Sequence, residues 1–320
     1  MNKLASTIGA SLLAVMSATP ALAEYPERTI KMIVAYSAGG GTDIAARTLV
    51  PYIEKYLGGT VVVENKAGAG GEIGFAEMAN AAADGYTIGF INSPNVLTIP
   101  IERKTNYDLN KIAAVANVIY DPGAFSVKAD SELKNLDDLI AYAKANPGAV
   151  TYGTTGVGSD DHLAALAFER QTGIQMTHVP FKGNVDVRAA VLGGHIMLAS
   201  MNVSQAIADH RDGTLRLFGQ MANKRWDGAS EIPTFKEQGY DIIMGSDRGI
   251  GAPNGVDATI LAKLSDAVAK AVADPEFQEK ARKQDLPITF MSSDEFAAHL
   301  VTLNDSYKAL WERAPWAPSK

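Results

Sequence analysis

The stretch Ala35-Tyr-Ser-Ala-Gly-Gly-Gly-Thr-Asp43 constrains the chain more than any other, because it joins an apolar run to an amphipathic pattern. The run Ile30–Val34 predicts a strand, and Ile44–Leu57 predicts a helix. Three consecutive glycines allow a tight turn whose backbone N–H groups can face a ligand, and the helix N-terminus adds a positive dipole end. The stretch therefore predicts an anion-binding turn, with a tight turn that binds nothing as the alternative.

The first 23 residues have the pattern of a secretory signal peptide. Lys3 gives a positive start, Leu4–Met16 is mostly apolar, and Ala21-Leu-Ala23 fits a small-residue cleavage site. The apolar run is shorter than the roughly 20 residues that a membrane-spanning helix needs. We therefore predict cleavage before Glu24 and a periplasmic mature protein.

Cysteine usage and charge narrow the function classes further. The chain contains no cysteine, which excludes a disulfide framework and a thiolate metal site. Loss of the leader removes Lys3 and changes the net charge from −7 to −8. An acidic chain is a poor partner for nucleic acid or an anionic membrane surface. An anion site must then rely on backbone amides and a few placed cations.

Short apolar runs alternate with helical patterns along most of the chain, which predicts an α/β fold with parallel strands. The expected strands are Ile30–Ala35, Thr60–Glu64, Tyr86–Ile91, Val150–Gly153, Met176–Pro180, Ile196–Ser200, Leu215–Gln220 and Ile288–Met291. The expected helices are Ile44–Leu57, Leu136–Ala145, Asp160–Thr172, Val185–Leu192, Asp257–Leu286 and Ser293–Arg313.

Two segments are candidate crossings between lobes: Val118–Gly123, which ends in a Pro-Gly break, and the glycine-rich Met244–Gly249. They predict one lobe of residues 24–122 plus 246–320 and a second lobe of residues 123–245. The C-terminal helices are expected to pack on the first lobe. A ligand would bind between the lobes, around a hinge. A single continuous sheet is the alternative.

A second glycine-rich loop, Thr151–Ser159, also lies between a strand and a helix. Ser159 is a suitable N-cap, and Thr154 and Thr155 add hydroxyls that could contact an anion. Asp160 and Asp161 complicate this interpretation, because their carboxylates compete for the same helix dipole. A capped helix after an ordinary turn is the alternative.

Single polar residues near the crossings complete the candidate site. Arg248 stands among glycines and could bind a carboxylate through two parallel hydrogen bonds. The alternative is an ion pair with Asp247 or another surface acid. Asp186 could cap a helix or contact the ligand, and Asn202 is a candidate amide contact. Ser93 is included as a further contact.

Other motifs argue against chemistry and cofactors. The glycines of Gly68–Gly74 follow the preceding strand too late for a dinucleotide-binding turn, so they predict a structural turn and a helix start, with Gly70 or Gly71 near the cleft. Ser159 and His162 begin one helix without a nucleophile elbow, and the histidines are too dispersed to bind a metal. We expect no cofactor. A secreted α/β hydrolase-like enzyme acting on a small carboxylate ester or amide is the alternative to a receptor.

The order of several motifs along the mature chain resembles the tripartite tricarboxylate transporter substrate-receptor family, also called Bug-type periplasmic solute receptors. The resemblance covers nearly all of the mature chain. The motifs are Gly39-Gly-Gly-Thr-Asp43, Val61-Val-Val-Glu-Asn65, Gly68-Ala-Gly-Gly71, Ala141-Tyr-Ala-Lys-Ala-Asn-Pro-Gly148, Gly156-Val-Gly-Ser159, His178-Val-Pro-Phe-Lys-Gly183 and Gly249–Pro253.

The resemblance implies a two-lobed Venus-flytrap fold that captures a small organic carboxylate for membrane permease subunits. It implies no catalysis, and we expect a monomer. The ligand contacts that it implies are Tyr36, Ser37, Ala38, Gly41 and Asp43 in the first loop and Thr154, Thr155 and Ser159 in the second. The first loop departs from the proline-rich pattern common in the family, since Ala35, Ser37 and Ala38 take those places. Arg248 leads us to favour a dicarboxylate, whose distal carboxylate it would bind.

Overall fold

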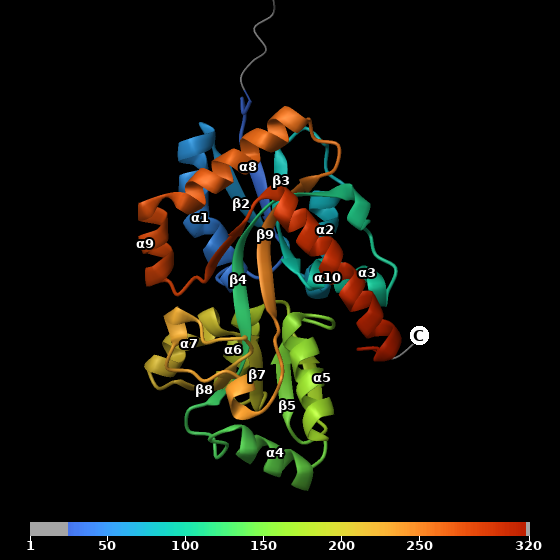
Figure 1. Cartoon of the computed structure of the whole chain (residues 1–320), viewed down its shortest axis with the longest axis vertical. Helices are drawn as coiled ribbons and strands as arrows, with labels where there is room; N and C mark the ends of the chain where they lie inside the picture. The colour runs from blue at the N-terminus through green and yellow to red at the C-terminus, as the bar shows by residue number, and fades with distance from the viewer. Residues whose placement is uncertain (1–24, 318–320) are drawn as a thin grey trace, which may run out of the picture.

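Two lobes are joined by a pair of long strands in the computed structural model, which describes residues 25–317. The predicted signal peptide, residues 1–23, lies outside the described residues. Strands β4 (Ile112–Lys128) and β9 (Gly245–Pro253) run antiparallel and side by side between the lobes (Figure 1). Both predicted crossings are therefore continuous strands rather than loops.

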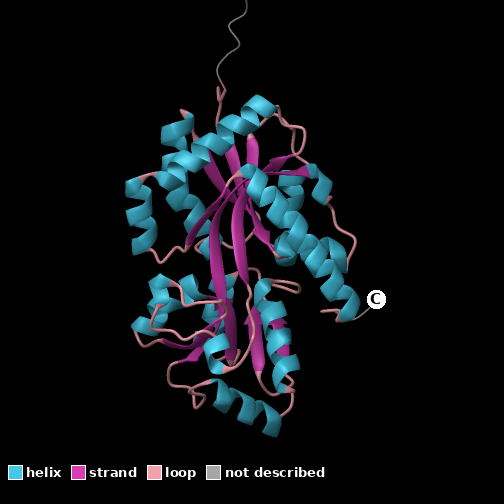
Figure 2. Cartoon of the chain, viewed as in Figure 1, coloured by secondary structure: helices cyan, strands magenta, loops and turns pink. Residues whose placement is uncertain are grey.

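Each lobe is a sheet covered by helices (Figure 2). The first lobe contains β1 (Ile30–Val34), α1 (Gly41–Leu57), β2 (Val61–Asn65), α2 (Glu72–Ala79), β3 (Thr87–Ser93), α3 (Asn95–Glu102), α8 (Ala258–Ala273), α9 (Pro275–Lys283), β10 (Ile288–Met291) and α10 (Ser293–Arg313). The second contains α4 (Leu136–Ala145), β5 (Thr151–Thr154), α5 (Asp160–Thr172), β6 (Thr177–Pro180), α6 (Asn184–Leu192), β7 (Leu198–Asn202), α7 (Val203–Arg211) and β8 (Leu215–Gln220).

The sheet is mixed, and its hydrogen bonds pass from one lobe to the other through β4. The strand order is β2-β1-β3-β9-β4-β7-β5-β6, with β8 and β10 also paired to β4. Strands that follow a helical crossover are parallel, as expected: β1 with β2 and β3, and β5 with β6 and β7. The crossing strands pair antiparallel with their neighbours. The chain therefore has both the two lobes that we predicted and the continuous sheet that was the alternative.

Pro122 and Gly123 do not break β4, contrary to the expectation of a Pro-Gly break. Pro122 is paired with Gly245 at the last position of the β9 ladder, and Gly123 begins the pairing with Asn202 of β7. A proline lacks the N–H that a strand interior needs, so it is tolerated at this change of partner. The predicted lobe boundaries at 122/123 and 245/246 stay predictions.

The predicted helical stretch Asp257–Leu286 is divided into two helices, α8 and α9. Asp274 ends α8 in an extended conformation and its side chain accepts a hydrogen bond from the N–H of Glu276 in α9. Pro275 follows at the first position of α9, where its missing N–H costs nothing. Lys55 of α1 pairs with Asp274 at 2.7 Å, so the break is held against the first lobe.

Separate apolar clusters fill the two lobes. In the first, Leu49 and Ile53 of α1 pack with Val268 of α8. In the second, Phe125 of β4 packs edge-to-face on Phe168 and Phe235, with ring centroids 5.4 and 5.3 Å apart. A further cluster crosses between lobes, since Leu163 at the start of α5 packs with Trp316 after α10. The end of the chain therefore completes an apolar contact between the lobes.

We expect Phe125→Ala to lower the free energy of unfolding by about 3–5 kcal/mol, because the ring is fully buried and its removal leaves a cavity in the second lobe. Phe290→Ala is the matched control, since this ring on β10 is 41% exposed and should change stability by less than about 0.5 kcal/mol. Urea unfolding followed by circular dichroism measures both. Equal losses in the two variants would contradict the packing described.

Candidate functional site

A small cavity lies where the two lobes meet the crossing strands. Its volume is about 20 Å³, enough for about one water molecule. Its lining is polar, with glycines from α1 and side chains from both lobes. The lining residues are Tyr36, Gly40, Gly41, Thr42, Asn92, Asn95, Thr155, Asp160, Asn184, Asn202, Gln205, Ser246 and Arg248.

The N-terminus of α1 forms one wall of the cavity. Its N-cap is Gly40, which has no side chain to accept a hydrogen bond from the first turn. The first-turn N–H groups of a helix have no intrahelical partner, and the helix dipole adds positive potential there. Gly41 and Thr42 bring this helix end to the cavity. A ligand oxygen could take the place that a capping side chain would occupy.

Arg248 also lines the cavity and is 1% exposed. Its Nη2 lies 2.7 Å from Oδ2 of Asp121 and donates to Oδ1 of Asn202 at 2.9 Å. The alternative pairing with Asp247 is wrong, because Asp247 faces Nε2 of His299 at 2.9 Å and the acid beside Arg248 is Asp121. Nε and Nη1 of Arg248 have no hydrogen-bond partner in the described structure.

Nη1 of Arg248 and the start of α1 face the same space. A Cβ added to Gly41 would lie 3.0 Å from this nitrogen. Unpartnered buried donors cost free energy, so this arrangement favours an acceptor between them. Oδ1 of Asn92 and of Asn184, both in the cavity wall, are buried acceptors that also have no partner. The cavity thus offers charged donors on one side and amide acceptors on others.

The hydroxyls of the second glycine loop are engaged within the protein. Thr155 Oγ1 donates to Asp161 at 3.0 Å, and Thr154 Oγ1 lies 2.6 Å from Nε2 of His178. Ser159 accepts from the N–H of His162, which confirms the predicted N-cap. Of these hydroxyl residues, Thr155 lines the cavity. Its donor is used, so contact with a carboxylate would require it to leave Asp161.

Asp160 reaches the cavity from the first turn of α5. Its Oδ2 accepts from Nδ2 of Asn202 at 2.6 Å. Burial raises the pKa of the Asp160 carboxyl to about 6, against the lowering effect of Asn202 and Arg248. The cavity therefore contains an acid that partly offsets the charge of Arg248.

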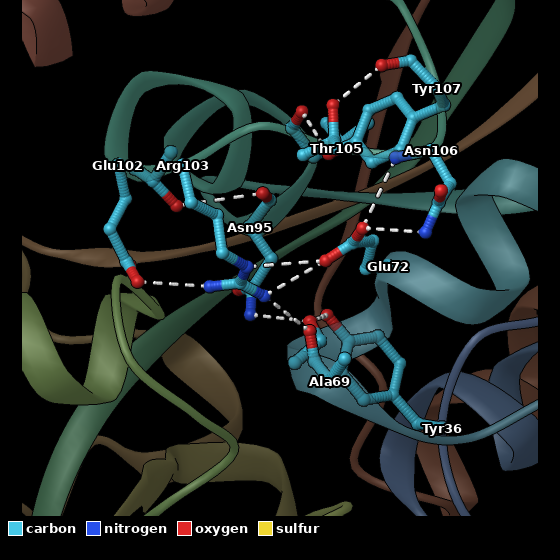
Figure 3. Close-up of polar contacts among 12 residues, drawn as sticks. Tyr36, Ala69, Glu72, Asn95, Glu102, Arg103, Thr105, Asn106 and Tyr107 are labelled. Carbon is cyan, nitrogen blue, oxygen red and sulfur yellow. Dashed lines mark hydrogen bonds and ion pairs between the residues drawn. The ribbon is translucent and has the colours of Figure 1, made fainter.

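A turn of four consecutive residues with positive φ, Gly68–Gly71, supports two more lining residues. Arg103 holds the turn by donating to the carbonyl of Ala69 at 3.0 Å and to Glu72 at 3.1 Å (Figure 3). The Gly70 carbonyl then accepts from Tyr36 and Asn95. Ala69 is held at φ 50°, a conformation that costs free energy for a residue other than glycine.

The same turn meets the second lobe. A Cβ on Gly156 would lie 3.0 Å from the Cα of Gly70, so the two backbones are in contact. Gly70 therefore approaches the junction of the lobes, as the sequence indicated. Arg103 and Glu72 contact this turn rather than the cavity, and they hold it in the position from which the Gly70 carbonyl accepts from lining residues.

Several predicted contacts lie outside the cavity wall. Ser37 donates to Asp186 at 2.9 Å, which links the lobes beside the cavity. Ala38 is exposed, and Ser93 is buried at the end of β3 with no partner for its hydroxyl. Of the predicted residues, the wall contains Tyr36, Gly41, Thr155, Asn202 and Arg248 and does not contain Ser37, Ala38, Asp43, Ser93, Thr154, Ser159 or Asp186.

Asp43 stabilises the first loop from inside. Its carboxylate accepts from the N–H of Gly39 at 2.8 Å, from Arg47 and from Asn65. Burial alone would raise the pKa of Asp43, but these hydrogen bonds lower it below its usual value. The carboxylate therefore fixes the glycine turn that precedes α1.

Ser159 and His162 do not form a nucleophile–base pair. Ser159 Oγ accepts from the backbone of His162, whose Nδ1 accepts from the N–H of Gly158 at 3.1 Å. The His162 ring stacks on His178 with centroids 4.0 Å apart. No cluster of metal-binding side chains occurs between residues 25 and 317, and no helix in that range is long and apolar enough to cross a membrane.

Comparisons with known proteins agree on one family. The model of the tripartite tricarboxylate transporter family receptor matches residues 45–311. A UPF0065 protein in the gbd 5' region of Cupriavidus necator is 37% identical over 315 residues, 97% of this chain and 94% of that one. The periplasmic binding protein BugD is 27% identical with a TM-score of 0.86, covering 92% and 100%. The structure of R. palustris Rpa4515 with adipate is 26% identical with a TM-score of 0.85, covering 92% and 100%.

We expect the His162–His178 stack to make stability sensitive to acid. Burial lowers the pKa of His162 to about 3 and of His178 to about 4, whereas an unfolded histidine titrates near about 6.5. Below about pH 6.5 the unfolded state therefore binds more protons than the folded state. The free energy of unfolding is highest above that pH and decreases as the pH falls towards 4.

Urea unfolding at pH 7 and pH 5 tests this expectation with the double variant His162→Gln/His178→Gln. The variant should lose less stability on acidification than the wild type, whatever its stability at pH 7. An equal loss would show that the two rings are not held neutral.

Proposed function

Since this chain belongs to the tripartite tricarboxylate transporter receptor family, we propose that its inter-lobe cavity captures a small dicarboxylate for delivery to a membrane permease. Members of the family are periplasmic substrate receptors rather than enzymes, which overturns the hydrolase alternative. They bind small carboxylates and work with transporter permeases. The dicarboxylate and the delivery step are our proposals for this chain.

The observation that carries the proposal is buried Arg248, whose Nη1 has no hydrogen-bond partner and lies beside the first turn of α1. Nη2 is already engaged by Asp121 and Asn202, so a ligand carboxylate would accept a charge-assisted hydrogen bond from Nη1 through one oxygen. The first turn of α1 faces the same space, and its N–H groups can bind a second anionic group without a cation. Two separate anion-binding elements in one cavity favour a ligand with two carboxylates.

The relative R. palustris Rpa4515, solved with adipate, supports the same ligand class, because adipate is a dicarboxylate. We also propose that residues 1–23 direct export and are removed before Glu24, which would place the receptor in the periplasm. The ligand contacts that we propose are the predicted residues in the cavity wall, with Asn92, Asn184 and Gln205 added.

The cavity is too small for a dicarboxylate unless the lobes or the wall residues move. We propose that the lobes separate by bending of the two crossing strands and close over the ligand. Small-angle scattering should then give a smaller radius of gyration with saturating adipate than without it. An unchanged radius with bound adipate would contradict lobe closure.

We expect Arg248→Lys to weaken binding of adipate about ten- to a hundredfold and to weaken binding of its monoamide less. Lysine keeps a positive charge beside Asp121, but its single nitrogen cannot stay on Asp121 and Asn202 and also donate to the ligand as Nη1 does. A hydrogen bond to a charged group contributes roughly 1.5–3 kcal/mol. Isothermal titration calorimetry with both ligands measures the difference.

Arg211→Lys is the matched control, since Arg211 is an exposed arginine paired with Glu231. It should leave both affinities unchanged. Equal weakening of the diacid and the monoamide by Arg248→Lys would assign Arg248 a structural role. If succinate, glutarate and adipate all fail to bind the wild type, the dicarboxylate proposal is wrong.

A further inference from the structure

An outer groove lies against the inner cavity, and the two share a wall. The groove has a volume of about 710 Å³, whereas the cavity has a volume of about 20 Å³. Four residues line both spaces: Gly40, Gly41, Asn184 and Gln205. These residues separate the buried Arg248 from the groove.

Gln205 is the member of this wall that is best placed to move. Gly40 and Gly41 are backbone at the start of α1, and Asn184 is 8% exposed at the start of α6. Gln205 is a partly buried side chain on α7. Its Nε2 donates to Oδ1 of Asn202 at 3.2 Å, within its own helix turn.

The Gln205 carboxamide occupies space that a ligand carboxylate would need. A Cβ on Gly41 would lie 2.7 Å from both Cδ and Nε2 of Gln205, and 3.0 Å from Nη1 of Arg248. A carboxamide and a carboxylate have nearly the same shape. The side chain therefore fills the region between the first turn of α1 and the guanidinium.

Asn202 keeps its position if Gln205 leaves. Its Oδ1 also accepts from Arg248, and its Nδ2 donates to Asp160 and to the carbonyl of Asp121. Outward rotation of Gln205 would thus break one hydrogen bond and leave the wall around Arg248 intact. The movement would join the cavity to the groove.

On the basis of the proposed function, we infer that Gln205 is a gate that a carboxylate displaces on entry and that limits the length of the ligand. With Gln205 turned outwards, one end of the ligand reaches Arg248 and the other extends towards the groove. The competing role is structural: the contact with Asn202 at the start of α7 would only support the helix N-terminus.

Three variants separate these roles: Gln205→Ala removes the gate, Gln205→Glu adds a negative charge in the same shape, and Gln171→Ala is an exposed control on α5 of the same lobe. The probes are succinate, glutarate, adipate and pimelate, measured by calorimetry and by stopped-flow fluorescence. A thermal melt of each variant checks folding.

We expect Gln205→Ala to raise the association rate constant several-fold and to move the preferred ligand towards longer diacids. Gln205→Glu should weaken the diacids about a hundredfold, because it places a like charge beside the ligand carboxylate. Gln171→Ala should match the wild type. A structural role would lower the melting temperature of Gln205→Ala and leave its rates and length preference unchanged.

Two failures are distinguishable. If the wild type binds diacids and Gln205→Ala changes neither the association rate nor the length preference, the gate is overturned and the proposed function stands. If neither the wild type nor Gln205→Ala binds any of the four diacids, both the gate and the dicarboxylate receptor are overturned.

Discussion

The ion pair between Arg248 and Asp121 is the interaction on which the centre of the molecule depends. Burying a guanidinium or a carboxylate alone is costly, so each of these side chains requires the other. Asp121 lies on β4 and Arg248 on β9, which means that the pair forms only where the two crossing strands run side by side. Asp121 also accepts from the backbone N–H and the hydroxyl of Ser204, which places α7 against the same point. The strands that connect the lobes therefore fix the position of the Arg248 guanidinium, the positive charge that would bind a ligand.

The two glycine-rich loops have the same strand–loop–helix pattern but end in different chemistry. At the second loop, Ser159 caps α5 with its own hydroxyl. At the first loop, Gly40 leaves the end of α1 without a side-chain cap, and Asp43 turns back to hold the loop. A helix end that is capped by a side chain has fewer free backbone N–H groups to donate to a ligand than one without such a cap. This difference explains why the first loop reaches the cavity through Gly40, Gly41 and Thr42, whereas most hydroxyls of the second loop face inward.

Local signals in the sequence predicted the elements that depend on local chemistry. The helix Asp160–Thr172 was predicted to the residue, because a serine cap precedes it and Gly173 ends it in the left-handed region. Helices α3 and α7 were not predicted, since they are short and α3 contains Pro100, whereas α2 was predicted only as a helix start within Gly68–Gly74. Strands β4 and β9 were seen only in part, because their pairing joins residues far apart in the sequence. Asn92, Asn184 and Gln205 were missed for the same reason: each is an ordinary amide side chain whose place in the cavity comes from tertiary packing.

The position of Trp316 in the apolar cluster that crosses between the lobes has a spectroscopic consequence. The chain contains three tryptophans, and two of them, Trp311 and Trp316, lie with ring centroids 4.6 Å apart at the end of α10. Trp316 is 5% exposed, and its indole N–H has no partner in the described structure. Indole emission shifts with the polarity around the ring, and the second lobe forms part of these surroundings, because a Cβ on Gly158 would lie 3.1 Å from the indole nitrogen. The protein therefore contains an intrinsic optical reporter of the distance between its lobes, with no dye or label to attach.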